Sequence, residues 1–118
     1  MTLPVIHQVE WGSGDVEVLK TFLTALFGWE FTLPMPGYVY YFCRLPEGPG
    51  VGLFQNPQAQ PGGTPNVSVK VASIPVMLEK AQALGGTIAV PQTPLPGGSF
   101  AFIKAPEGNL IGLHQLDG

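Results

Sequence analysis

Hydrophobic and polar residues alternate at the start of the chain in a way that predicts a β-strand. In the stretch 5–11, Val9 and Trp11 fall on one face, and Gln8 and Glu10 fall on the other. Strict alternation over several residues is typical of a strand with one buried face. We therefore expect Gln8 and Glu10 to point away from the core.

A helix is predicted directly after this strand. Asp15 is placed to cap its N-terminus, because a side-chain oxygen there accepts a hydrogen bond from a free backbone N–H group. Gly28 ends it, since glycine readily adopts the left-handed conformation found just past a helix. The apolar residues in between recur at helical spacing and predict one buried stripe. They are Val16, Leu19, Phe22, Leu23 and Leu26.

Three more strands and two turns complete the first half of the chain. The second of these strands is rich in aromatic residues, which suit a pleated surface. The turns contain Pro and Gly, which interrupt regular structure. The strands are predicted at 29–33, 38–44 and 51–55, and the turns at 34–37 and 46–48.

The second half repeats this order. Residues 57–64 are rich in Pro, Gly and Gln, lack an apolar period and predict a linker. A strand at 66–71 then precedes a helix that Ser73 caps and Gly85-Gly86 ends. The apolar positions of this helix are Val76, Leu78, Ala81 and Leu84. The remaining predicted elements are strands at 87–90, 100–104 and 111–115, with a long turn at 91–98.

Two runs of sequence, 44–55 and 104–115, share one pattern without a gap. Each has a basic residue, an apolar residue, Pro-Glu-Gly and two further residues, and ends in a β-branched residue followed by Gly-Leu-X-Gln. The segments 8–28 and 66–86 also have equal length. A match of this extent predicts one supersecondary unit used twice. We expect an α+β fold of two βαβββ modules in tandem, at about 4–56 and 65–116, within a single domain over 1–118.

Each module leaves one face of its sheet open, because its single helix covers only the other. The helix-facing positions are apolar: Val9, Trp11, Val51, Leu53, Val67, Val69, Ile111 and Leu113. The open face carries mostly polar or small residues: Gln8, Glu10, Gly52, Phe54, Asn66, Ser68, Lys70, Gly112 and His114. Two modules, paired within the chain or across a dimer, would close these curved open faces into a shared concave pocket.

Composition narrows the functional class. The 118 residues are 45% hydrophobic and 11% charged, with a net charge of −3 from five basic and eight acidic residues, so no basic surface for nucleic acid is expected. No apolar run is long enough to span a membrane, and the start of the chain lacks the features of a signal peptide. Cys43 is the single cysteine and is predicted to be a small buried apolar residue. We expect a soluble cytoplasmic protein.

The two βαβββ modules, the run 26–31 (Leu-Phe-Gly-Trp-Glu-Phe) after the first helix and the run 106–113 (Pro-Glu-Gly-Asn-Leu-Ile-Gly-Leu) near the end resemble the vicinal oxygen chelate superfamily. This group includes glyoxalase I, extradiol dioxygenases and bleomycin-resistance proteins. The resemblance covers nearly the whole chain. It implies a pocket for a small molecule and a homodimer.

Enzymes of that superfamily hold one divalent metal ion with four side chains, which in the glyoxalase pattern are His or Gln, Glu, His and Glu. The resemblance carries these positions onto Gln8, Gly52, Asn66 and Gly112 of this chain. Glycine has no ligating side chain, and neutral amides bind transition metals weakly compared with imidazole or carboxylate. We therefore expect no metal ion or other cofactor, which argues against glyoxalase I or iron dioxygenase activity.

Two residues on the open face are candidates for acid–base chemistry. Glu10 beside aromatic residues would have a raised pKa and could act as a general base; the alternative is a solvated carboxylate paired with Lys70. His114 could bind a ligand or act as a base near neutral pH; the alternative is a hydrogen-bonded histidine at the pocket rim. The expected ligand-binding residues are Gln8, Glu10, Tyr40, Phe54, Asn66, Ser68, Lys70, Phe102 and His114.

Three functional hypotheses follow from these residues. The first is a metal-free protein that binds a small, partly apolar molecule, as the bleomycin-resistance proteins do. The alternative is a lyase, isomerase or dioxygenase with a non-standard divalent-metal site built from Glu10, His114 and either Gln8 or His7. The third is metal-free acid–base catalysis by Glu10 or His114.

Overall fold

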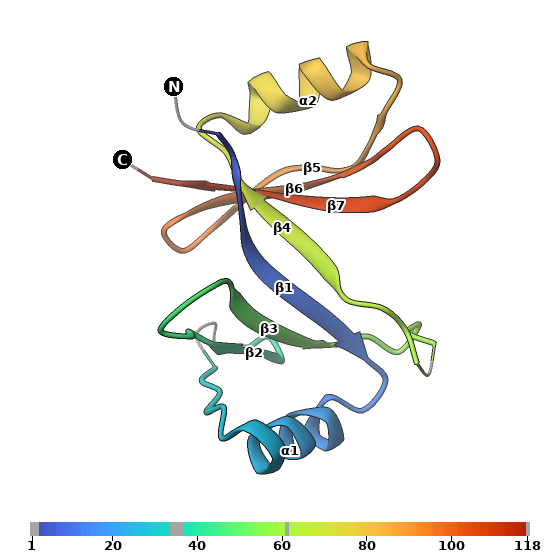
Figure 1. The fold of residues 1–118 in the computed structure, drawn as a ribbon. Helices are drawn as coiled ribbons and strands as arrows, with labels where there is room; N and C mark the ends of the chain where they lie inside the picture. The colour runs from blue at the N-terminus through green and yellow to red at the C-terminus, as the bar shows by residue number, and fades with distance from the viewer. Residues whose placement is uncertain (1–2, 34–36, 61, 118) are drawn as a thin grey trace. The chain divides into compact units, whose positions relative to one another are not determined.

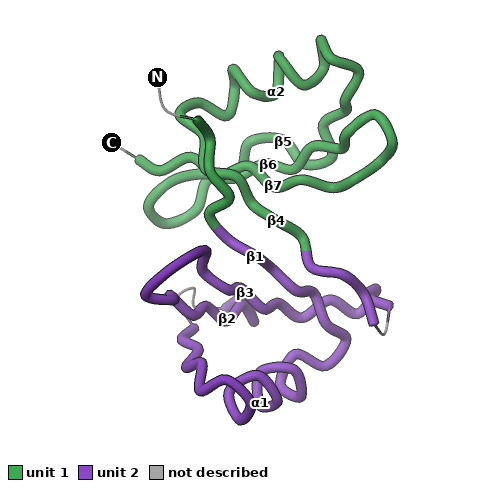
Figure 2. The backbone as a smooth tube through the Cα atoms, in the orientation of Figure 1, with its two compact units in different colours: residues 1–7, 66–118 green, residues 8–65 purple. Residues whose placement is uncertain are grey.

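The chain forms seven strands and two helices within the residues that its computed structural model describes, 3–33, 37–60 and 62–117 (Figure 1). This is an α+β architecture, as predicted. The chain divides into two compact units: unit 2 holds residues 8–65, and unit 1 holds residues 66–118 together with 1–7 (Figure 2). The boundary between residues 7 and 8 falls inside strand β1 (Val5–Ser13), and the boundary between residues 65 and 66 follows the predicted linker. The prediction of a single domain stays a prediction.

Unit 2 contains one helix and three strands in the order β2-β3-β1. Its strand β1 begins in unit 1 and continues here. β3 runs parallel to β1 and antiparallel to β2. The elements are β1 (Val5–Ser13), α1 (Val16–Phe27), β2 (Tyr40–Cys43) and β3 (Gly50–Gln55).

Unit 1 contains one helix and four strands in the order β4-β7-β6-β5. β7 runs parallel to β4 and antiparallel to β6, and β6 runs antiparallel to β5. The elements are β4 (Asn66–Lys70), α2 (Ile74–Ala83), β5 (Thr87–Leu95), β6 (Gly98–Lys104) and β7 (Leu110–Leu116).

The internal repeat is confirmed by the register of the parallel strand pairs. In unit 2, Glu10 of β1 lies opposite Gly52 of β3. In unit 1, Ser68 of β4 lies opposite Gly112 of β7. Gly52 and Gly112 are equivalent positions of the repeated run. Each lies on the last strand of its module, opposite the equivalent residue of the first strand. Two tandem modules of one design are therefore present in the structure.

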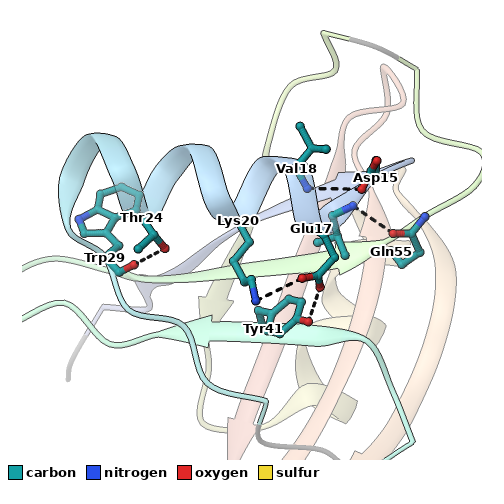
Figure 3. Close-up of polar contacts among 9 residues, drawn as sticks. Asp15, Glu17, Val18, Lys20, Thr24, Trp29, Tyr41 and Gln55 are labelled. Carbon is teal, nitrogen blue, oxygen red and sulfur yellow. Dashed lines mark hydrogen bonds and ion pairs between the residues drawn. The ribbon is translucent and has the colours of Figure 1, made fainter.

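The last residue of the repeated run has the same structural role in both units. Gln55 Oε1 accepts a hydrogen bond from the backbone N–H of Val16 at 3.0 Å (Figure 3). Gln115 Oε1 accepts one from the N–H of Ile74 at 2.6 Å. Each glutamine thus satisfies one of the backbone donors that a helix N-terminus leaves free. The repeated glutamine connects the last strand of a module to the start of its helix.

The predicted caps are confirmed. Asp15 accepts from the N–H of Val18 at 3.3 Å, and Ser73 accepts from the N–H of Val76 at 3.3 Å. Gly28 follows α1 in the left-handed region with φ of 74°, a conformation that glycine adopts without a steric penalty. The helix boundaries therefore follow from local sequence signals.

Each unit has its own apolar core between helix and sheet. Leu53 and Ile74 are completely buried in their respective cores. The buried residues of unit 2 are Val16, Leu23, Cys43, Val51 and Leu53. Those of unit 1 are Val71, Ile74, Ala101 and Leu113. The predicted helix-facing side of the sheet is confirmed at Trp11, Val51, Leu53, Val69 and Leu113, which all belong to these cores or pack against them.

The predicted helix stripes were only partly right. In α1, Phe22 and Leu26 are exposed. In the second predicted helix, Val76 is exposed, and so is Leu84, the residue that follows the end of α2. The core of unit 1 instead receives Ile74, with Met77 and Leu78 packed against it. A helix lying on a narrow sheet buries only the side chains directly above the strands, so an apolar sector wider than the sheet stays partly uncovered.

One strand prediction and one turn prediction were wrong. The stretch 29–33 forms only an isolated bridge between Thr32 and Phe42, because Trp29 and Phe31 pack against the core instead of joining the ladder. The stretch 91–95, predicted as a turn, continues β5 with register shifts. Proline is tolerated there because β5 is an edge strand. The predicted turn at 34–37 lies mostly outside the described residues.

Candidate functional site

Unit 2 brings together three of the residues predicted for ligand binding. The hydroxyl of Tyr40 donates a hydrogen bond to Glu10 Oε2 at 2.6 Å. Gln8 Nε2 donates to the Tyr40 oxygen and, at 3.3 Å, to Glu10 Oε2. Both hydrogen bonds that Glu10 makes within the described residues end on Oε2. The other carboxylate oxygen, Oε1, is left for a further donor.

The absence of a side chain at Gly52 makes this cluster possible. Gln8 and Glu10 are two residues apart and lie on the same face of β1, and Glu10 lies opposite Gly52. A Cβ atom added to Gly52 would lie 2.8 Å from Cζ of Tyr40 and 2.9 Å from Nε2 of Gln8. Carbon atoms in contact normally lie about 3.5–4.0 Å apart. The phenol of Tyr40 and the amide of Gln8 therefore occupy the space that a side chain at position 52 would need.

Two further glycines on this face are covered by aromatic rings in the same way. The ring of Phe42 lies 2.7 Å from the position of a Cβ on Gly50, and the ring of Phe54 lies 2.8 Å from that on Gly12. Phe54, a predicted ligand-binding residue, thus packs on β1 beside the polar cluster. Rings from β2 and β3 thus lie on this face of the sheet, over the glycines that flank the polar cluster.

The electrostatics of the cluster follow from this packing. Burial raises the pKa of Glu10, and the hydrogen bond from Tyr40 partly offsets that rise. Burial also raises the pKa of Tyr40, and the neighbouring charge of Glu10 raises it further. The phenol therefore stays protonated and serves as a donor to the carboxylate. A carboxylate in such surroundings is a stronger base than one in water.

Unit 1 holds the other predicted site residues. His114 of β7 lies opposite Lys70 of β4 and opposite Phe100 of β6. Its ring stacks on that of His7 with centroids 5.0 Å apart. Its Nδ1 atom is buried and has no hydrogen-bond partner among the described residues. Burial lowers the pKa of His114, and the charge of Lys70 lowers it further.

The remaining predicted residues of unit 1 have simpler surroundings. Phe102 covers Gly112, because a Cβ there would lie 3.2 Å from the ring. Ser68 is buried, Asn66 is half-buried and Lys70 is exposed. The structure thus groups Gln8, Glu10 and Tyr40 by direct hydrogen bonds. The alternative pairing of Glu10 with Lys70 joins residues of different units and stays a prediction.

The sequence did not predict that Tyr40 would donate a hydrogen bond to Glu10. It also did not predict that the missing side chain at Gly52 would leave the space that Tyr40 occupies. A sequence signal existed, because Gly50 and Gly52 on β3 stand across from a strand that places Tyr40 and Phe42 on one face. Large rings beside glycines on a neighbouring strand predict that the rings lie over the glycines. A hydrogen bond in unit 1, from Gln92 to the buried hydroxyl of Ser99 at 2.9 Å, was also not predicted.

Comparison with known proteins gives matches among solved structures. No protein-family profile and no curated protein matches the sequence. A variant of methylmalonyl-CoA epimerase from Streptomyces coelicolor, in complex with 2-nitronate-propionyl-CoA, is 13% identical, and the match covers 99% of this chain and 100% of that chain with a TM-score of 0.75. A glyoxalase/bleomycin resistance protein/dioxygenase superfamily member from Vibrio splendidus 12B01 is 18% identical, over 96% of this chain and 99% of that chain, with a TM-score of 0.68.

The chain has the vicinal oxygen chelate fold. A further match is named as an NAD-dependent benzaldehyde dehydrogenase from Legionella pneumophila, with 15% identity over 93% of this chain and 98% of that chain and a TM-score of 0.68. Structures that share the vicinal oxygen chelate fold therefore carry names of different activities. At these identities the likeness shows the fold and leaves the activity to be argued from the site.

The four positions at which the resemblance places metal ligands, Gln8, Gly52, Asn66 and Gly112, do not offer the residues that hold the metal ion in the glyoxalase pattern. Gly52 and Gly112 have no side chain to ligate a metal ion, and both positions are covered by aromatic residues of neighbouring strands. Gln8 uses its amide nitrogen as a donor to Tyr40 and Glu10. No group of three or more His, Cys, Asp or Glu side chains that could hold a metal ion occurs in 3–33, 37–60 and 62–117.

Proposed function

We propose that this protein binds a small, partly apolar molecule without a metal ion. The ligand lies on the open sheet face of unit 2, where aromatic rings provide apolar contacts and the cluster of Gln8, Glu10 and Tyr40 provides polar ones. Ligand sites in proteins usually combine a mainly apolar lining with a few placed polar groups. The face of unit 2 has this composition.

The observation that carries the proposal is the packing of Tyr40 over Gly52. In metal-dependent relatives, the resemblance places a carboxylate at the position of Gly52. Here that position has no side chain, and the phenol of Tyr40 and the amide of Gln8 fill the space. The polar atoms of the face are already linked to one another by hydrogen bonds. This arrangement supports recognition by hydrogen bonding in place of coordination.

A thermal-shift screen of small molecules against metal-free protein tests the proposal. A ligand present at about a hundred times its Kd stabilises the folded state by about 2.7 kcal/mol, which a melting curve detects easily. Ligands that act at this face should lose most of their shift in Tyr40→Phe and Glu10→Gln. They should keep it in Tyr38→Phe, because Tyr38 is 69% exposed and takes no part in the cluster. A ligand that raises the melting temperature equally in the wild type and in all three variants would bind elsewhere, which would contradict the proposal.

A second candidate function is proton transfer by Glu10 without a metal ion. The raised pKa of Glu10 and its hydrogen bond from Tyr40 favour it, since a general base works best when its pKa lies near the working pH. Methylmalonyl-CoA is a reasonable first substrate, because a methylmalonyl-CoA epimerase shares the fold. Exchange of its α-proton in D2O with a chelator present, followed by NMR, should depend on Glu10 and vanish in Glu10→Gln. Equal exchange in both proteins would remove this candidate.

A further inference from the structure

The open face of unit 1 carries basic groups at a point that a phenyl ring fills in unit 2. Lys70 of β4 lies opposite His114 of β7. Through the internal repeat these positions correspond to Gly12 and Phe54, which also lie opposite each other. In that pair the phenyl ring lies over the glycine. Unit 1 therefore presents an ammonium group and an imidazole where unit 2 has a ring packed on a glycine.

No acidic residue balances these basic groups within the strands of unit 1. The acidic residues in 3–7 and 66–117 are Glu79, Glu107 and Asp117, and none of them lies in a strand. Like charges directly opposite each other on neighbouring strands are destabilising. Burial lowers the pKa of His114, and the charge of Lys70 lowers it further. An anion placed between the two side chains would remove this repulsion.

The ring of His114 is held in a way that leaves one nitrogen as a donor. It stacks on the ring of His7, which belongs to the same unit, with centroids 5.0 Å apart. Nδ1 is buried and has no hydrogen-bond partner among the described residues, whereas Nε2 is not in this state. A buried N–H group that lacks an acceptor is costly. The proton of the neutral imidazole therefore belongs on Nε2, where it can be donated to a ligand.

Aromatic rings lie next to this pair of residues. Phe100 of β6 lies opposite His114, and its ring meets that of Phe102 edge to face, with centroids 5.9 Å apart. The ring of Phe102 lies 3.2 Å from the position of a Cβ on Gly112. Gly112 and His114 are two residues apart, so both rings share the face of His114. A ligand held by Lys70 and His114 would find this apolar surface about one strand spacing, ~4.8 Å, away.

We propose that Lys70 and His114 bind the oxyanion group of an organic acid or organic phosphate, whose apolar part lies on the rings of Phe100 and Phe102. Lys70 supplies the positive charge, and its exposure leaves the ammonium group accessible. The Nε2–H group of His114 supplies a directed hydrogen bond. Hydrogen bonds to carboxylate or phosphate belong to the strong class, because the acceptor is charged. This site lies in unit 1 and does not depend on the ligand proposed for unit 2.

NMR of the histidine rings during titration with benzoate or phenyl phosphate tests the proposal. Either anion should shift the ring signals of His114 to saturation, and the anion with the lower Kd identifies carboxylate or phosphate as the preferred group. Benzamide has the same ring as benzoate but no charge, and it should bind about tenfold more weakly, since a charged acceptor strengthens the hydrogen bond. Two anions that both leave the His114 signals unchanged would overturn the proposal.

Variants separate this site from a general attraction of anions to the protein. Lys70→Met removes the charge, keeps a side chain of similar length and should raise the Kd of the anion about tenfold. Lys80→Met is the matched control, because it removes the same charge from an exposed position on α2, and it should leave the Kd unchanged. His114→Phe introduces the residue of unit 2 and should abolish the rise in melting temperature that the anion causes in the wild type.

Two outcomes would contradict the assignment even if an anion binds. Equal Kd values in Lys70→Met and Lys80→Met would show that Lys70 does not contact the anion. Equal affinities for benzoate and benzamide would show that the protein recognises the ring and not the oxyanion. Because Lys70 is exposed, its replacement should leave the fold intact, and this comparison does not depend on how well His114→Phe folds.

Discussion

Replacing Gly52 with alanine should disrupt the polar cluster in a defined way. The added methyl group would lie 2.8 Å from Cζ of Tyr40 and 2.9 Å from Nε2 of Gln8, well inside normal contact distance. Both partners come from neighbouring strands of one sheet, so the backbone has little freedom to yield. The phenol of Tyr40 must rotate away and lose its hydrogen bond to Glu10.

The size of the effect follows from two contributions. Overpacking of a filled site costs about 1–3 kcal/mol. A hydrogen bond to a charged group is worth about 1.5–3 kcal/mol, although water can partly replace it because Tyr40 is not fully enclosed. We therefore expect Gly52→Ala to lower the free energy of unfolding by about 3 kcal/mol.

A double-mutant cycle in urea measures whether Tyr40 is the cause. In the background of Tyr40→Ala only the amide of Gln8 lies close to the added methyl group, and it can turn into the space that the phenol has left. Gly52→Ala should then cost less than about 1 kcal/mol. Gly14→Ala is the control, because nothing lies within 4 Å of a Cβ at that position, and it should change stability little. If Gly52→Ala costs the same in both backgrounds, the packing of Tyr40 over Gly52 does not explain the glycine.

Four other predictions concern the helix ends and the titrating groups. Gln55→Ala and Gln115→Ala should each lower the free energy of unfolding by about 1 kcal/mol, since each removes a helix-start acceptor. Gly28→Ala should cost about 1 kcal/mol, because φ there is 74°. The raised pKa of Glu10 means that wild-type stability falls as pH rises from 4.5 through that pKa, and Glu10→Gln should flatten this part of the curve. The lowered pKa of His114 means that stability is lost as pH falls from 6.5 through that pKa, and His114→Gln should remove this loss.

Urea unfolding across a pH series measures all of these effects. Gln58→Ala is the control for the capping glutamines, because Gln58 is exposed and belongs to no helix or strand. Equal stabilities of Gln115→Ala and Gln58→Ala would show that the capping bond is not significant. A pH dependence of Glu10→Gln that matches the wild type would show that Glu10 keeps an ordinary pKa in the folded protein.

Features set by residues close in sequence were predictable. The helix boundaries at Asp15 and Gly28 follow from capping chemistry, and the repeat predicted two modules with one register. The equivalence of Gln55 and Gln115 was visible in the sequence. Their role was not, because each bonds to a helix about forty residues earlier in the chain.

Features set by the width of the sheet were not predictable from periodicity. An apolar stripe shows which side of a helix prefers burial, but not how many strands lie beneath it. Phe22 and Leu26 continue the stripe of α1 and yet remain exposed. In the same way, the apolar run 29–33 reads as a strand, although Trp29 and Phe31 pack against the core and only one bridge forms.

The sequence predicted which residues belong to the candidate site, but not the hydrogen bonds that join them. Alternation placed Gln8 and Glu10 on the open face, and the aromatic strand supplied Tyr40. The hydrogen bonds among them depend on which residue lies across from Gly52, which requires the register of three strands. The stacking of His7 on His114 depends on the path of the N-terminal strand, and periodicity carries no information about it.

Metal binding by protein purified without a histidine tag tests the central claim most directly. Elemental analysis, followed by melting curves with added Zn²⁺, Ni²⁺, Mn²⁺ or Fe²⁺, would detect a site, since a metal ion at about a hundred times its Kd raises stability by about 2.7 kcal/mol. Because Tyr40 and Gln8 fill the position of a metal-binding carboxylate over Gly52, we predict no stoichiometric metal and no rise in melting temperature. One equivalent of tightly bound metal, with a matching rise in melting temperature, would contradict the account.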